Sequence, residues 1–125
     1  MRFSLLFPAL ALGLIAGCAQ TAIQPMSKDT FKIATNAAPA CGANGARNVA
    51  FKSASIEVIR RGYDKFIILG DSHDSDFWSG DHKQDMVVKV IPESSPEARN
   101  ALSARQQLGD NWQELLAKGA PTTCG

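Results

Sequence analysis

Residues 45–69 read GARNVAFKSASIEVIRRGYDKFIIL, and this stretch decides the fold of the chain. It predicts a helix over residues 45–61, because small and apolar side chains recur there at spacings of three and four. Gly62 follows two arginines, which is typical of a left-handed cap at the negative end of a helix dipole. Residues 63–69 then carry a continuous apolar run, which predicts the buried central strand of a sheet.

Two further strands are predicted around this unit. Residues 30–34 alternate between polar and apolar side chains, and residues 86–91 form a second apolar run that ends at Pro92. Between the last two strands, residues 70–85 are polar and must contain the turn of an irregular hairpin, whose loop we place at residues 70–82. Residues 36–44, which contain proline and glycine, predict a loop before the helix.

The end of the chain predicts a second helix. It begins at Ser95-Pro96-Glu97, which supplies a cap, a first-turn proline and an early acid. Its apolar stripe places Trp112 in the core, with a bend at Gly109. The order strand, helix, strand, strand, helix predicts an α/β or α+β two-layer sandwich with a three-stranded sheet, whose strand order stays open.

The N-terminal residues have the features of an export signal. Arg2 is followed by an apolar stretch over residues 5–15, which is shorter than a membrane span of about 20 residues. The stretch ends in Leu14-Ile15-Ala16-Gly17-Cys18, which resembles the lipobox of bacterial lipoproteins. The resemblance implies that residues 1–17 are removed and that Cys18 carries the lipid. An ordinary signal peptide cut after Ala16 is the alternative.

We expect one domain after the signal. Residues 18–125 number 108 (125 minus 17), enough for a single core. Residues 18–29 lack a helical or strand period and predict a lipidated tether, which leaves residues 30–125 as one globular domain. Without Arg2, 12 basic residues (13 minus 1) face 12 acidic ones. This balance argues against nucleic acid as a partner.

The cysteines predict a disulfide. With Cys18 assigned to the lipid, Cys41 and Cys124 remain as a pair in an oxidising compartment. They do not form a Cys-x-x-Cys redox motif, so we expect a structural bridge rather than a catalyst. Two buried thiols or one reactive thiol are the alternatives.

A second resemblance covers about half of the chain. Two segments are similar to those of small bacterial envelope lipoproteins of unassigned function: one runs from Ala54-Ser55-Ile56-Glu57 through Gly62-Tyr63 to the strand at residues 65–68, and the other is the tail from Leu108-Gly109-Asp110-Asn111-Trp112 to Cys124. The resemblance implies no catalytic residues. Many sorted lipoproteins carry an inner-membrane retention aspartate after the lipidated cysteine, whereas this chain has Ala19. The expected location is therefore the outer membrane, facing the periplasm, with the bilayer and an envelope protein as possible partners.

The polar hairpin contains the candidate metal ligands. His73, His82, Asp71 and Asp76 are residue types that could converge on a divalent cation. They lack a fixed ligand spacing, and a solvated turn that keeps the hairpin from pairing with other chains is the alternative. We therefore expect neither a metal nor another cofactor.

Phe77 and Trp78 are the candidate partner contacts, because an aromatic pair on a loop suits a protein, peptidoglycan or lipid partner. The alternative is that the rings fold back onto the sheet. The run Ser72-His73-Asp74 contains the residue types of a hydrolytic triad, but consecutive residues cannot generally reach one another in that geometry. The sequence thus predicts a non-enzymatic structural or interaction lipoprotein, with ligand or metal binding by residues 70–82 as the alternative.

Overall fold

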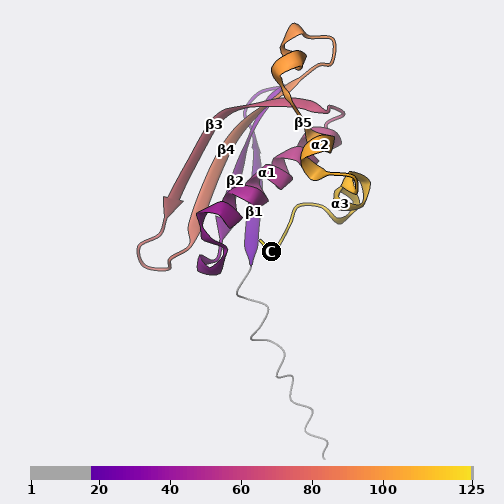
Figure 1. The fold of residues 1–125 in the computed structure, drawn as a ribbon. Coiled ribbons are helices and arrows are strands. Elements are labelled where there is room, and N and C mark those ends of the chain that lie inside the picture. The colour runs from indigo at the N-terminus through magenta and orange to yellow at the C-terminus, as the bar shows by residue number, and fades with distance from the viewer. Residues whose placement is uncertain (1–17, 125) are drawn as a thin grey trace, which may run out of the picture.

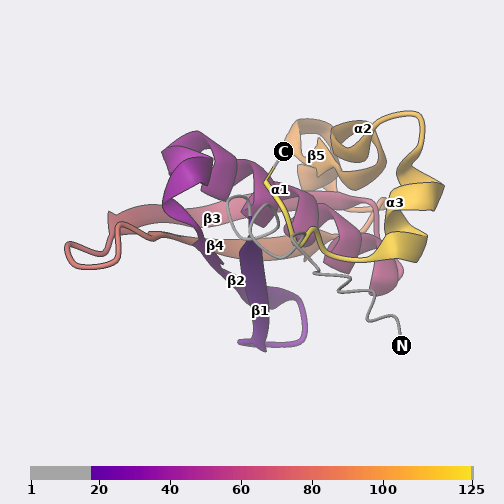
Figure 2. The same ribbon diagram turned by 90° about the horizontal axis from the view of Figure 1, so that it is seen from below.

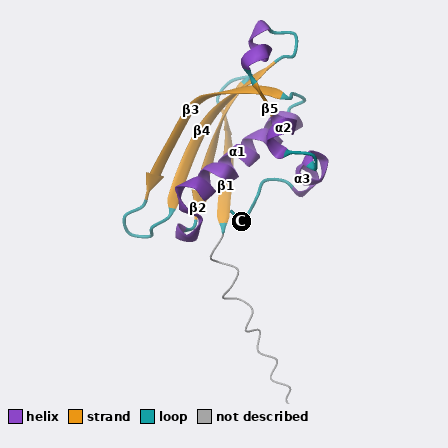
Figure 3. Ribbon diagram, in the orientation of Figure 1, coloured by secondary structure: helices purple, strands orange, loops and turns teal. Residues whose placement is uncertain are grey.

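A computed structural model describes residues 18–124 and shows a single sheet with helices on one face (Figures 1 and 3). The sheet is antiparallel throughout, with the order β1-β2-β4-β3-β5. Its strands are β1 (Ala19–Pro25), β2 (Thr30–Ala37), β3 (Lys65–Ser75), β4 (His82–Ile91) and β5 (Leu102–Ser103). The fold class is therefore α+β.

The helix predicted from the central stretch is present as α1 (Gly42–Arg60), preceded by the 3-10 turn η1 (Pro39–Cys41). It ends where predicted, since Gly62 has φ +88°. Figure 2 shows α1 lying along one side of the sheet. Its small residues allow a close approach to that face, and the core forms between them from Ala50, Ala54, Val58, Phe31, Ile33, Phe66, Met86, Val88 and Val90.

The prediction of a three-stranded sheet is wrong, because the sheet has five strands. Residues 19–25, predicted as part of a tether, form β1 and pair with β2 from Ala19↔Ala37 to Pro25↔Phe31. This edge strand is mostly exposed and has no apolar alternation, so the residues reveal no strand period. Its backbone hydrogen bonds to β2 hold it in place, and they do not depend on side-chain type.

The hairpin loop is shorter than the predicted residues 70–82. Residues 70–75 and 82–85 belong to β3 and β4, and only residues 76–81 lie outside the two strands. A register shift between Ile68 and Gly70 admits one extra residue into β3. The polar arms pair through their backbones, and oppositely charged residues such as Asp74 and Lys83 lie across from each other in the register, so polar composition does not make them a loop.

The prediction that the apolar run at residues 63–69 is the central strand of the sheet is wrong. The central strand is β4, which separates β3 from β2. Phe66 is buried, but Leu69 is 57% exposed. The strand with the most buried side chains is instead β4, in which alternate residues from Gln84 to Val90 are buried and face α1. A continuous apolar run does not by itself distinguish a central strand from its neighbour.

The second long helix is also a wrong prediction. The segment divides into η2 (Pro96–Asn100), β5, α2 (Ala104–Leu108) and α3 (Trp112–Lys118). The break is tertiary, because Asp64 accepts hydrogen bonds from the Ser103 hydroxyl at 2.7 Å and the Arg105 N–H at 3.0 Å. Trp112 is only half-buried, with the Arg105 guanidinium 4.9 Å from its ring centroid.

The predicted export signal, residues 1–17, lies outside the described part of the chain. Within residues 18–124, every helix is too short or too polar to cross a bilayer.

Candidate functional site

The candidate site lies where four strands end together. Ala19 is paired with Ala37, Ala37 with His82, and His82 with Ser75, so β1, β2, β4 and β3 form one row. We call this row, together with Cys18, η1 and residues 76–81, the Cys18 end of the sheet; it is the lower end in Figure 1. It brings the predicted lipidation site and the predicted aromatic contact residues to the same end of the molecule.

Cys18 is exposed and is held by the folded chain on both sides. It forms an isolated antiparallel bridge with Thr123, and its carbonyl accepts a hydrogen bond from the Ala38 N–H at 2.9 Å. Ala19, which follows it, is only 4% exposed and donates its N–H to the Thr122 carbonyl at 2.8 Å. The compact domain therefore includes residue 18, and no slack chain separates Cys18 from β1.

Cys41 and Cys124 form a disulfide, as predicted, with an S–S distance of 2.07 Å and a Cα–Cα distance of 5.7 Å. The bridge joins η1 to the end of the described chain and packs beside Ala19. Gly45 makes room for it, because a Cβ atom there would lie 3.1 Å from the Cys41 Cβ atom. The disulfide thus pins the C-terminal tail beside Cys18.

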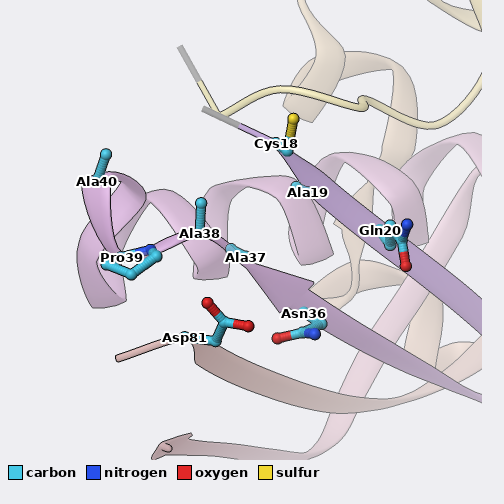
Figure 4. Close-up of a pocket in the computed structure, with 9 residues that line it drawn as sticks. All are labelled: Cys18, Ala19, Gln20, Asn36, Ala37, Ala38, Pro39, Ala40 and Asp81. Carbon is cyan, nitrogen blue, oxygen red and sulfur yellow. The ribbon is translucent and has the colours of Figure 1, made fainter. Parts of the chain in front are cut away.

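A shallow pocket of about 530 Å³ lies between Cys18 and the base of the β3–β4 loop (Figure 4). Its wall is formed mainly by small apolar side chains from the end of β2 and from η1, including Ala38, Pro39 and Ala40. Asp81 supplies the carboxylate at its far side. Such a wall suits a hydrocarbon chain or an apolar side chain better than a charged substrate.

The β3–β4 loop is an ordered turn organised by Asp76. Asp76 Oδ1 accepts hydrogen bonds from the N–H groups of Trp78 at 2.8 Å and Ser79 at 3.1 Å. These N–H groups, Ser79 first, lower the pKa of the Asp76 carboxyl below its ordinary value. The backbone closes the turn, with the Asp76 N–H bonded to the Asp81 carbonyl and the Gly80 N–H bonded to the Asp76 carbonyl, both at 2.9 Å.

Phe77 and Trp78 project from this turn into solvent, 89% and 91% exposed. Their rings meet edge to face, with centroids 5.4 Å apart. Of the two alternatives for this pair, folding back onto the sheet is therefore wrong. The turn that Asp76 holds directs both side chains away from the core.

The four metal-ligand candidates are divided between different partners. His73 Nε2 and His82 Nδ1 lie 2.9 Å apart, and the two rings stack with centroids separated by 5.1 Å. Asp71 instead pairs with Arg47 at 3.0 Å and accepts a hydrogen bond from Gln84, while Asp76 caps its own turn. Across residues 18–124, no three His, Cys, Asp or Glu side chains gather in a way that could hold a metal ion.

Ser72, His73 and Asp74 do not assemble as a triad. They lie opposite Asp85, Gln84 and Lys83 on β4, so they follow one another along β3. Consecutive strand residues point to opposite faces, which places the histidine on the other face of the sheet from Ser72 and Asp74.

Two features of the site are missing from the sequence-based prediction: β1, and the contact between the loop and η1. A Cβ atom on Gly80 would lie 3.3 Å from Pro39 Cγ, although the two residues are far apart in the chain. The dipeptide Ser79-Gly80 was a usable signal for the turn, but nothing local indicates its partner. Comparison with known protein families, curated proteins and solved structures found no match to this chain.

Proposed function

We propose that the protein is a lipid-anchored lipoprotein of the bacterial cell envelope, with a non-enzymatic structural or interaction role. One observation carries the proposal: an apolar stretch that ends in Leu14-Ile15-Ala16-Gly17-Cys18, which resembles a lipobox. The placement of Cys18 supports it, because an exposed residue at the margin of the domain can carry acyl chains without disturbing the core. Anchoring by more than one acyl chain would be stable.

An interaction role, rather than catalysis, is supported by the chemistry of the Cys18 end. The serine, histidine and aspartate of residues 72–74 are divided between two faces of the sheet. The pocket wall there is mainly alanine and proline. Metal binding has less support, because Asp71 already forms an ion pair and Asp76 already accepts hydrogen bonds within its own turn.

The proposed location is the outer membrane, facing the periplasm, because Ala19 stands where a retention aspartate would lie. Replacing Ala19 by aspartate is a poor test of this proposal. Ala19 is buried against Ala37, Ala46 and Val49, so a carboxylate there would destabilise the fold as well as change the sorting signal. Density separation of the two membranes from cells that express the native chain measures the location directly.

The anchoring proposal is tested by Cys18→Ser, with Ala22→Ser as a control on an exposed position of the adjoining strand β1. We expect the native chain and the control to enter the detergent phase in a phase-partition assay and to incorporate labelled palmitate. Cys18→Ser should do neither, because the acylated sulfur is lost. Intact mass of the native protein should show the loss of residues 1–17. A native chain that stays in the aqueous phase, or a Cys18→Ser variant that still incorporates palmitate, would contradict the proposal.

A further inference from the structure

We propose that the Cys18 end of the sheet rests directly on the bilayer, and that Phe77 and Trp78 insert into the lipid interface as a second point of attachment. This inference rests on the proposed function, because it takes Cys18 as the acylated residue. It adds an orientation and a lipid-binding site, which a lipid anchor by itself does not specify.

No slack chain lies between Cys18 and the sheet. Its carbonyl is bonded to the Ala38 N–H, and the next residue, Ala19, is already paired with Ala37. A flexible tether of ten or so residues would let a domain stand tens of ångströms above a membrane. Here acyl chains on Cys18 would instead bring the end of the sheet to the membrane surface.

The aromatic pair lies in a loop at the same end of the sheet as Cys18. The β3–β4 loop leaves the sheet at Ser75 and returns at His82, in the same row as Ala19 and Ala37. Figure 1 shows the loop and the start of β1 at the same end of the molecule, and Figure 2 shows the loop extending sideways from it. Three strand spacings separate β1 from β3, roughly 14 Å along the row. Two attachments at that separation would set the tilt of the domain.

The chemistry of the two exposed rings suits a membrane interface. Phe77 and Trp78 are 89% and 91% exposed although the turn around them is hydrogen-bonded, so their exposure does not come from a lack of structure. Exposing two large rings in water is unfavourable. A membrane interface accommodates an apolar ring together with the indole N–H of tryptophan. A bilayer brought to this end by Cys18 would therefore stabilise the pair as it stands.

The surface between the two attachments is compatible with this orientation. The loop contacts Pro39 through Gly80, and Pro39 and Ala40, both exposed, share a pocket with Cys18 and Asp81. The surface from the anchor to the loop is thus continuous and carries mostly small apolar side chains (Figure 4). It has no cluster of basic residues, so insertion should depend on apolar burial rather than on anionic lipid.

The test measures the depth of Trp78 in the full-length acylated protein, reconstituted into vesicles of neutral phosphatidylcholine with brominated acyl chains. The chain has two tryptophans, so Trp112→Phe leaves Trp78 as the only indole, and Trp78→Phe leaves Trp112 on α3 as the matched control. We expect about a twofold loss of Trp78 emission relative to unbrominated vesicles, because an interfacial ring reaches the acyl boundary. Trp112 should show little change. Circular dichroism checks that both variants are folded.

The remaining outcomes separate this inference from the proposed function. If the protein stays bound to the vesicles while Trp78 is unquenched and open to acrylamide, the anchor stands and the inserted loop is wrong. Equal quenching of both tryptophans would also overturn the orientation. A Trp78 that is inaccessible to acrylamide in native envelopes, and yet is not quenched in brominated vesicles, is a further outcome. This result would overturn insertion into lipid and would indicate that the loop binds a protein partner. A native protein that carries no acyl group would overturn the proposed function and this inference together.

Discussion

At the scale of single residues, Asp76 and Gly80 determine the shape of the β3–β4 loop. Asp76 satisfies two N–H groups that the turn would otherwise leave to solvent, and Gly80 takes φ +75° where the chain turns back. The loop holds Phe77 and Trp78 outward, and we expect it to do so only while both conditions are met. Each residue therefore supports a separate prediction.

The first prediction concerns the pH dependence of the turn. The pKa of Asp76 is lowered by its hydrogen bonds to the Ser79 and Trp78 N–H groups, so the charged carboxylate is the form that stabilises the turn. This stabilisation is present above the ordinary pKa of the carboxyl and is lost as the pH falls through the lowered value in the folded protein. Carboxyl titration by NMR should place the pKa of Asp76 below the ordinary value for an aspartate.

Asp76→Asn is the control for this prediction, because the amide oxygen can still accept both hydrogen bonds but does not titrate over this range. The amide signals of Trp78 and Ser79 should shift with acid in the native chain and not in the variant. An Asp76 that titrates at its ordinary value would contradict the assignment.

The second prediction concerns Gly80→Ala. The substitution places a Cβ atom at positive φ and 3.3 Å from Pro39 Cγ, so we expect it to lower the free energy of unfolding by about 1–2 kcal/mol. Gly62→Ala is the matched control, because Gly62 also has positive φ but no atom within 4 Å of the added Cβ. Urea unfolding of both variants separates backbone strain from contact with Pro39. Adding Pro39→Ala should recover part of the loss only for Gly80→Ala; recovery in both variants would contradict the contact.

At the scale of elements, the disulfide compensates for a tail that buries little by itself. Residues 120–124 are half-buried or exposed and follow the short helix α3. The tail is held by the Cys41–Cys124 bridge, by the Ala19 N–H bonded to the Thr122 carbonyl, and by the bridge between Cys18 and Thr123. Removing the disulfide should therefore release the tail and also loosen the start of β1.

The third prediction is that Cys41→Ala together with Cys124→Ala destabilises the protein by up to about 4–5 kcal/mol, the chain-entropy value for a bridge that joins residues 83 apart. That is a large share of the stability of a small domain, about 5–15 kcal/mol. Urea unfolding measures the loss, and reduction of the native chain should give a similar value. Hydrogen exchange should increase first at Ala19. An unchanged free energy of unfolding would show that the bridge is not a structural staple.

At the scale of the whole molecule, the domain boundary would determine how the proposed lipoprotein sits on a membrane. A tether over residues 18–29 would let the domain move independently of its anchor. The structure instead makes residues 19–25 the edge strand of the sheet and buries Ala19 beside the disulfide. The anchor and the domain would then move as one body.

The fourth prediction follows from this boundary. A chain that begins at residue 18, with Cys18→Ser for solubility, should unfold cooperatively and stay monomeric. A chain that begins at Thr30 should be markedly less stable and prone to self-association, because it loses the Ala19 contacts and exposes the full edge of β2. Urea unfolding and size-exclusion chromatography distinguish the two. Equal stability of the two chains would show that β1 does not stabilise the domain, and it would support the interpretation of residues 18–29 as a tether.

The sequence predicted many of the residues of the site, but it did not predict that they lie close together at one end of the sheet. The cysteine pair followed from the count of cysteines and the expected compartment, and the aromatic pair followed from its place in a polar segment. That Cys18 and Trp78 lie at the same end of the sheet depends on the pairing of β2 with β4. No local property of either strand specifies that register.

The sequence by itself determined α1, its glycine end and the existence of the β3–β4 hairpin, since these depend on helical periodicity or local turn chemistry. It also predicted the disulfide, as the one pairing that remains when Cys18 is assigned to the lipid. Only the tertiary structure decided that residues 19–25 are a strand, that β4 is central, and that the last helix is broken at Ser103. The physical reason is common to all three. Backbone hydrogen bonds between strands, and the bonds of Asp64 to Ser103 and Arg105, join segments distant in the chain, and their partners exist only once the sheet has formed.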